Sequence, residues 1–198
     1  MKKAKLVAGS LAGNLVLRPR KLASRNLLVT PLKSRQRNAP LRIRRATPRD
    51  TAVILGLVRG LAKYERLLQW FHPNAKRFRR HGFGRRRYCD TLICTQAGRP
   101  IGFALYYFTY STFACRPILF VEDLFVLPDE RGQGAGKLLM SALARVAIRQ
   151  GCSQMAWNVL HWNTSAIKFY RRLGAGLDKT WLLVRLGDAP LHRLARSH

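Results

Sequence analysis

The stretch FVEDLFVLPDERGQGAG, residues 120–136, constrains the fold most, because an apolar run passes there into charged, glycine-rich sequence and then into a helical pattern. Residues 121–127 predict a strand of bulky apolar side chains that only Glu122 and Asp123 interrupt. From Lys137 onward, apolar residues recur at the spacing of one helix face. The glycine-rich segment between them is therefore predicted to be a loop that opens a helix.

The composition of that loop favours a bound anion. Three glycines, Gly132, Gly134 and Gly136, let backbone N–H groups approach a ligand closely, and the free N–H groups at a helix start favour negative charge. Arg131 and Lys137 add positive charge, so the pattern fits a pyrophosphate, although an ordinary tight turn between a strand and a helix would carry the same glycines. The loop has neither the GKS or GKT of a Walker loop nor GxGxxG with a downstream ribose-binding acid. Its spacing is Arg131-x-x-Gly134-x-Gly136.

The rest of the chain predicts strands and helices in the order β-α-α-β-β-β-α-β-α-β. The predicted elements are a strand at 41–47, a helix from the cap at 47–50 to about Glu65, a basic helix after Pro73, antiparallel strands at 87–95 and 100–110, a strand at 153–160, a helix capped at 163–165 and ended by Gly174, and a last strand at 181–186. This order predicts an α/β sandwich with a mixed sheet, not the regular alternation of a doubly wound fold.

The charge of the chain points to anionic partners. Its 37 basic and 9 acidic residues give a formal net charge of +28. Such a chain attracts nucleic acid, acidic membranes or phosphorylated cofactors and repels polycations, although a genome-wide arginine bias or an acidic cell interior would give the same balance. The four cysteines show no CxxC pair or zinc spacing, so we expect reduced thiols in an intracellular protein and no metal site. No apolar run reaches transmembrane length, so we expect a protein that is soluble or peripheral to a membrane. The expected location is the cytoplasm, or an organelle if residues 1–40 direct import.

The first 40 residues differ in composition from the rest. Residues 1–40 carry many lysines and arginines and no acid, which fits an organelle transit peptide, a disordered basic arm, or a start codon assigned upstream of a domain that begins near Leu41. We expect residues 41–186 to form one domain and residues 187–198 a basic C-terminal tail.

Several separate stretches resemble one family. They are LAKYE (61–65), GFG (82–84), GFALYYFTY (102–110), VEDLFV (121–126), RGQGAG (131–136) and WNTSAIKFYRRLGA (162–175). Over about residues 41–186 the chain resembles the diamine (spermidine/spermine) acetyltransferase family of the GNAT superfamily. The resemblance implies the α/β GNAT fold, with a mixed and mostly antiparallel sheet flanked by helices, acetyl-CoA as the cofactor and a homodimer.

The same resemblance assigns residues to the cofactor and to the substrate. The backbone of Leu124, Phe125 and Val126 would line the pantetheine arm, and Gly132, Gln133, Gly134, Ala135, Gly136 and Lys137 would hold the pyrophosphate, with Arg131 adding charge. Ala156, Trp157, Asn158, Asn163, Thr164, Ser165 and Ala166 would border the rest of the cofactor. Tyr64, Glu65 and Glu122 match positions that contact the amine, and Tyr170 matches the position of the family's general acid.

Amine acetylation gives two of these residues a chemical task. An ammonium is not nucleophilic, so the site needs a carboxylate that attracts the amine and helps to remove its proton, directly or through water. Glu122 is the candidate, and its alternative role is a buried partner for an arginine. A phenol aimed at the sulfur can protonate or stabilise the leaving thiolate. Tyr170 is the candidate for that task, and its alternative role is packing in the core.

The predicted function is transfer of an acetyl group from acetyl-CoA to a primary amine of a small molecule by direct attack. The family's polyamine enzymes surround the amine with acids, whereas this chain places Arg66 and a run of arginines at 77–87 nearby in sequence. This favours a lysine-like amino acid over a polyamine as the acceptor. The alternatives are acetylation of a protein or peptide, and a nucleic-acid-binding protein that uses the basic surface and keeps a vestigial acetyltransferase fold.

Overall fold

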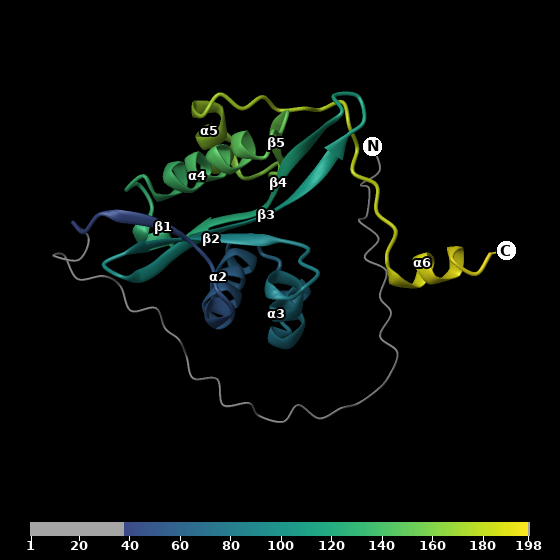
Figure 1. Cartoon of the computed structure of the whole chain (residues 1–198), viewed down its shortest axis with the longest axis horizontal. Coiled ribbons are helices and arrows are strands. Elements are labelled where there is room, and N and C mark those ends of the chain that lie inside the picture. Colours follow the sequence, from purple (N-terminus) through teal and green to yellow (C-terminus); the bar gives the residue numbers. More distant parts are fainter. Residues whose placement is uncertain (1–37, 198) are drawn as a thin grey trace, which may run out of the picture. The chain divides into compact units, whose positions relative to one another are not determined.

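The computed structural model describes residues 38–197 (Figure 1). Of the predicted basic arm at 1–40, only residues 38–40 are therefore among the described residues. The strands are β1 (Leu41–Arg45), β2 (Asp90–Gln96), β3 (Arg99–Ser111), β4 (Arg116–Val126) and β5 (Gln154–Trp157). The α-helices are α2 (Thr51–Tyr64), α3 (Ala75–Phe83), α4 (Ala135–Arg149), α5 (Thr164–Arg172) and α6 (Asp188–Leu194). Short 3-10 turns η1 (Pro48–Asp50), η2 (Leu68–Trp70) and η3 (Pro128–Glu130) join them.

The strands form one sheet with the spatial order β1-β2-β3-β4-β5. The first four strands pair antiparallel, and β5 pairs parallel to β4. This confirms the predicted α/β fold class with a mixed, mostly antiparallel sheet. The predicted order of elements is also confirmed as far as α5.

The helices cover both faces of the sheet (Figure 1). On one face, α2 buries Ile54 and Leu57 against Phe103 and Phe125 of the sheet. On the other face, α4 packs its apolar stripe, which includes Leu139, against the strands, and Phe169 and Tyr170 of α5 pack against the same core. The helices α2 and α4 bury the sides that their spacing of apolar residues predicts.

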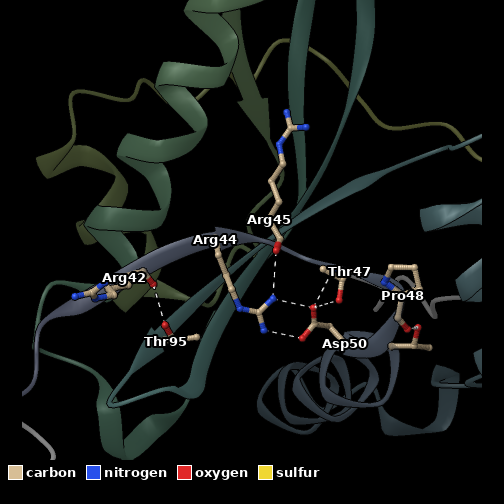
Figure 2. Close-up of polar contacts among 8 residues, drawn as sticks. Arg42, Arg44, Arg45, Thr47, Pro48, Asp50 and Thr95 are labelled. Carbon is tan, nitrogen blue, oxygen red and sulfur yellow. Dashed lines mark hydrogen bonds and ion pairs between the residues drawn. The ribbon is translucent and has the colours of Figure 1, made fainter.

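A polar cluster fixes the entry of the chain into α2 (Figure 2). The Asp50 carboxylate accepts hydrogen bonds from both terminal nitrogens of Arg44, at 2.8 and 2.6 Å. It also accepts from the backbone N–H and the hydroxyl of Thr47, at 2.7 and 2.9 Å. Pro48 occupies the first turn, where its missing N–H needs no partner. The predicted cap at 47–50 is confirmed, and it ties β1 to α2.

The predicted last strand at 181–186 is wrong. Residues 175–187 have no regular structure, and β5 is the last strand among the described residues. The side chains of Trp181, Leu182 and Val184 are 80 to 88% exposed. Alternating bulky apolar residues suit a strand, but a strand also needs a neighbour to pair with, and the segment has none among residues 38–197.

Candidate active site

A bulge in β4 places two carboxylates on the same face of the sheet. Asp123 pairs with Leu105 of β3, the next paired residue is Val121, and Glu122 is the extra residue between them. Leu105 belongs to the core on the α2 side, so Asp123 faces that side too. The Glu122 carboxylate lies 3.4 Å from the hydroxyl of Tyr107, which donates to it from the same face. A regular strand would have sent these two neighbouring side chains to opposite faces.

The pairing between β4 and β5 ends at the same place. The parallel ladder runs from Ile118 with Gln154 to Val121 with Trp157 and then stops. Beyond it, residues 122–126 and 158–160 line the two walls of a cavity of about 660 Å³. Because no strand of the described residues lies beside β4 at 122–126 on this side, an extended ligand chain can pair with its backbone there.

The glycine loop closes one end of this cavity. Gly132 and Gly134 adopt positive φ values of 80° and 89°, which glycine takes without strain, and α4 begins at the next residue, Ala135. The start of α4 contributes Ala135, Gly136 and Lys137 to the cavity lining. The free N–H groups of a helix 15 residues long thus face the cavity together with a lysine, which fits a phosphate group.

Tyr170 of α5 lies in the wall of the cavity. Its ring packs against Trp157 and Phe169, with centroids 5.1 and 5.3 Å away. Burial, with a smaller contribution from the negative charge of Glu65, raises the pKa of the Tyr170 phenol to about 12. The hydroxyl therefore keeps its proton at neutral pH and can donate it.

Two contacts cross the cavity. The Tyr64 hydroxyl at the end of α2 donates to the side-chain oxygen of Asn163 at 3.2 Å, and the same oxygen accepts the Ala166 N–H that begins α5. The Arg131 guanidinium lies 4.4 Å from the centroid of the Tyr64 ring, and its Nε donates to the Val126 carbonyl at 3.1 Å. Arg131 therefore lies against β4 and α2, beside the loop.

Three carboxylates gather at the α2 side of the cavity, although the chain has only nine acidic residues. Glu65, Glu122 and Asp123 all line it. Burial raises the pKa of Glu65. Burial and then the charges of Glu122 and Glu65 raise the pKa of Asp123 to about 7. A cationic ligand at this end would relieve the repulsion among the three groups.

Most of the predicted site residues meet at this one cavity, including all of those assigned to the amine and to catalysis. The lining contains Tyr64, Glu65, Glu122, Leu124, Phe125, Val126, Arg131, Gly132, Gly134, Ala135, Gly136, Lys137, Asn158, Asn163, Ser165, Ala166 and Tyr170. Ala156 and Trp157 line a second cavity along α4 and β5, and Thr164 is exposed. Gln133 turns inward, where it donates to Glu130 at 3.3 Å and accepts from Gln96 at 3.2 Å.

Asp123 is the functional candidate that sequence reasoning missed. Strict alternation along the strand puts it opposite Glu122, away from the amine. The signal was the three-residue step from Val121 to Leu124, both of which pack on the α4 side. Two residues on one face of a regular strand are separated by an even number of positions, so an odd step indicates a bulge.

Comparison with known proteins agrees with this geometry. Residues 60–175 match the model of the acetyltransferase (GNAT) family. The thialysine N-epsilon-acetyltransferase of Mus musculus is 35% identical over 169 residues, which cover 79% of this chain and 98% of that protein. The spermidine/spermine N(1)-acetyltransferase-like protein 1 of Homo sapiens is 31% identical over 163 residues, which cover 77% of this chain and 23% of that protein.

Solved structures share the fold. An integron cassette protein from the mobile metagenome of V. cholerae superposes with a TM-score of 0.67 at 24% identity, covering 79% of this chain and 98% of its own. The aminoglycoside N-acetyltransferase AAC(6')-Iy, solved in complex with CoA, gives a TM-score of 0.58 at 24% identity, covering 75% of this chain and 95% of its own.

Proposed function

The chain belongs to the GNAT acetyltransferase family, and on that premise we propose that it transfers an acetyl group from acetyl-CoA to the primary amine of a small, lysine-like molecule. The family makes the chain a GNAT-type N-acetyltransferase. The observation that carries the proposed acceptor is the gathering of Glu65, Glu122 and Asp123 at one end of the cavity that Tyr170 also lines.

The residues present fit coenzyme A. The glycine loop and the start of α4 would hold the pyrophosphate through backbone N–H groups, with Lys137 adding charge. The backbone of β4 at 124–126, which lies beyond the end of the pairing with β5, would pair with the amides of the pantetheine arm. When bound, acetyl-CoA supplies an acetyl thioester to the space between β4 and Tyr170.

The chain's own side chains would perform two proton transfers. A carboxylate of the acidic cluster accepts the proton of the acceptor ammonium, which frees the nitrogen lone pair for attack on the thioester carbonyl. The Tyr170 hydroxyl donates a proton to the sulfur as it leaves. The raised pKa of Tyr170 keeps that proton available throughout the neutral range.

Charge distinguishes the candidate acceptors. The cavity attracts a cation, but the molecule as a whole carries +28 and slows the approach of a polycation. Thialysine and lysine carry a carboxylate beside their amines, so their net charge is small. Relatives at 35 to 39% identity act, by their names, on thialysine. We therefore place thialysine and lysine ahead of spermidine.

The test is acetyl-CoA turnover by the purified protein with thialysine, lysine, spermidine and a basic peptide, at low and high salt. We expect the highest kcat/KM with thialysine or lysine, and a value for spermidine that rises with salt as the repulsion is screened. Tyr170→Phe should lose activity, and Tyr110→Phe, which changes an exposed tyrosine, should keep it. Absence of turnover with every amine would overturn the proposal. A higher kcat/KM for the basic peptide than for the small amines would mean that the acceptor is a peptide and not a lysine-like molecule.

A homodimer is the second part of the proposal. The exposed apolar side chains of Trp181, Leu182 and Val184 lie in a segment without regular structure, and such a patch is typical of an interface. A second copy would cover it. We expect light scattering to give a dimer for the native protein and a monomer for Val184→Asp; a native monomer would exclude the dimer.

Binding of a polyanion is a further role that α3 favours. Its residues Lys76, Arg77, Arg79 and Arg80 are exposed, as are Arg85, Arg86 and Arg87 beyond it. Phosphate backbones are attracted to such surfaces without sequence preference. We expect a variant that lacks residues 1–37 to be retained on RNA in a salt-sensitive manner, and reversal of the α3 charges to abolish retention. Indifference of the shortened protein to RNA would exclude this role.

Among residues 38–197, no helix is both long and apolar enough to cross a membrane.

A further inference from the structure

We infer that Asp123, and not its neighbour Glu122, is the carboxylate that takes the proton from the acceptor ammonium, while Glu122 and Glu65 hold the cation in place. The inference rests on the proposed acetylation of an amine and divides the work among the three acids of the cavity. Four observations support it: the bulge, the difference in exposure, the lack of partners around Asp123, and the charges that surround it.

The bulge turns both carboxylates toward the amine end of the cavity but leaves them in different surroundings. Glu122, as the extra residue, is exposed, and its carboxylate accepts from Tyr107 at 3.4 Å. Asp123 pairs with Leu105 and is mostly buried, next to the core beneath α2. A carboxylate in water is a weak base, whereas burial makes it a stronger one. The position of Asp123 therefore suits proton removal better.

Within the described part of the chain, no protein group competes for the oxygens of Asp123. Among residues 38–197, no side chain or backbone N–H donates a hydrogen bond to its carboxylate, and no arginine or lysine pairs with it. Asp50 shows the contrast, since it accepts four hydrogen bonds. Glu130 is also occupied, by an ion pair with Arg99. A mostly buried carboxylate without a partner, in the wall of a cavity, is available to an ammonium.

The neighbouring charges tune the basicity of Asp123. Burial is the first cause that raises its pKa to about 7, and the charges of Glu122 and Glu65 add to it. Cys89 lies on the segment between α3 and β2, and its thiol pKa is raised first by burial and then by nearby negative charges, among them that of Asp123. The other titratable groups that line the cavity are Tyr64, Glu130, Arg131, Lys137, Tyr170, Arg172 and Arg185. A base whose pKa lies near the working pH is both largely ionised and strong enough to remove a proton.

The bonds and protons balance in this arrangement. An oxygen of Asp123 takes one N–H proton of the ammonium, and the freed lone pair forms the C–N bond to the acetyl carbon. The C–S bond breaks, and its electron pair stays on sulfur, which receives the Tyr170 proton. The second proton lost by the nitrogen returns to Tyr170 through solvent, and Asp123 releases its proton to water.

The experiment compares Asp123→Asn, Glu122→Gln and the matched surface change Asp178→Asn by the pH dependence of kcat and KM. Asp178 is exposed and does not line the active-site cavity. For the native protein and Asp178→Asn we expect kcat/KM to fall below a pKa near 7. For Asp123→Asn we expect kcat to drop about 10²- to 10⁴-fold, with loss of that limb of the profile.

Glu122→Gln separates the two assignments. If Asp123 is the base, this variant raises KM, keeps most of kcat and moves the acidic limb to lower pH, because removal of the neighbouring charge lowers the pKa of Asp123. If Glu122 is the base, the variant loses kcat and the limb, and Asp123→Asn changes mainly KM. That second pattern would overturn the inference while leaving the acetyltransferase function intact.

A second readout does not depend on turnover. In protein labelled with ¹³C at the aspartate carboxyl carbons, one resonance should titrate near neutral pH in the native protein and in Asp178→Asn and be missing in Asp123→Asn. If every aspartate titrates in the ordinary acidic range, the inference fails even if the enzyme is active. If the resonance is present and no amine is acetylated, the proposed acetylation fails, and the inference that rests on it falls with it.

Discussion

Replacement of Asp50 by asparagine should destabilise the fold by breaking the cluster that joins β1 to α2 (Figure 2). Asp50 is 8% exposed, and its carboxylate accepts four hydrogen bonds, two from Arg44 and two from Thr47. Asparagine keeps one acceptor oxygen and turns an NH₂ group toward donors. Hydrogen bonds to a charged group contribute about 1.5–3 kcal/mol each. The Arg44 side chain is 43% exposed and can be rehydrated, which reduces the loss.

We therefore expect the free energy of unfolding to fall by about 2–4 kcal/mol at neutral pH, or the Tm by about 5–15 °C for a domain of this size. The Arg44 guanidinium holds the pKa of Asp50 well below its usual range. The stabilisation is thus complete above the unfolded pKa, near 3.8, and is lost as the pH falls below it. The gap between native protein and variant should shrink accordingly in acid.

Urea denaturation near pH 7 and near pH 3 measures the loss in the free energy of unfolding and its dependence on pH. The control is Asp90→Asn, which breaks an exposed ion pair with Arg87 at 3.4 Å and should change stability by less than about 1 kcal/mol. The double variant Arg44→Gln, Asp50→Asn should lose less than the sum of the single changes, because the two share one interaction. A gap below about 0.5 kcal/mol, or one that is equal at both pH values, would refute the reasoning.

Three further outcomes follow from the site and the core. Tyr170→Phe should lower kcat by about 10²- to 10³-fold and leave coenzyme A affinity unchanged in calorimetry, since only the phenol proton is lost; equal turnover would exclude the acid role. Because the pKa of Asp123 is raised in the folded state, ionisation of its carboxyl costs more free energy there than in the unfolded chain. The free energy of unfolding of the native protein should therefore decline as the pH rises from about 4 to 7. Asp123→Asn should then be the more stable protein by about 2–4 kcal/mol at pH 8, measured in urea, and the difference should vanish near pH 4. Gly102→Ala should cost about 1–3 kcal/mol, because a Cβ there would lie 2.7 Å from the Phe125 carbonyl oxygen, whereas Gly176→Ala meets nothing within 4 Å and should be neutral.

Local signals in the sequence predicted the elements that local physics determines. The cap at 47–50 forms because proline and a short acid fit a helix start. The 97–98 turn forms because Ala97 and Gly98 take positive φ values of 49° and 77°, as a tight hairpin turn between paired strands requires. The glycine loop was predictable for the same reason, since Gly132 and Gly134 take positive φ values. Each of these features depends on residues that are close together in the chain.

Features that depend on distant partners were not predictable in the same way. Trp181 and its neighbours have strand propensity, but whether they pair depends on a neighbouring strand, and none of the strands in the described part of the chain lies beside them. The bulge at Glu122 depends on the register of β4 with β3. The odd spacing between Val121 and Leu124 was the only sign of it in the apolar pattern. That register decides which acids reach the cavity, so the cluster of Glu65, Glu122 and Asp123 was the least predictable part of the candidate site.

Net charge and local charge act at different distances, which resolves the conflict between a basic chain and a cationic acceptor. At physiological salt the field of exposed arginines falls off over about 8 Å, so it affects how often a cation arrives. Inside the cavity, Asp123 and its two acidic neighbours act over shorter distances and at lower effective dielectric, where each charge interacts more strongly. The basic surface should therefore make kcat/KM depend on salt, whereas the acidic cluster should determine kcat and its dependence on pH. An acceptor that carries its own carboxylate avoids the first effect and keeps the second, and this supports the proposal of a lysine-like amine over a polyamine.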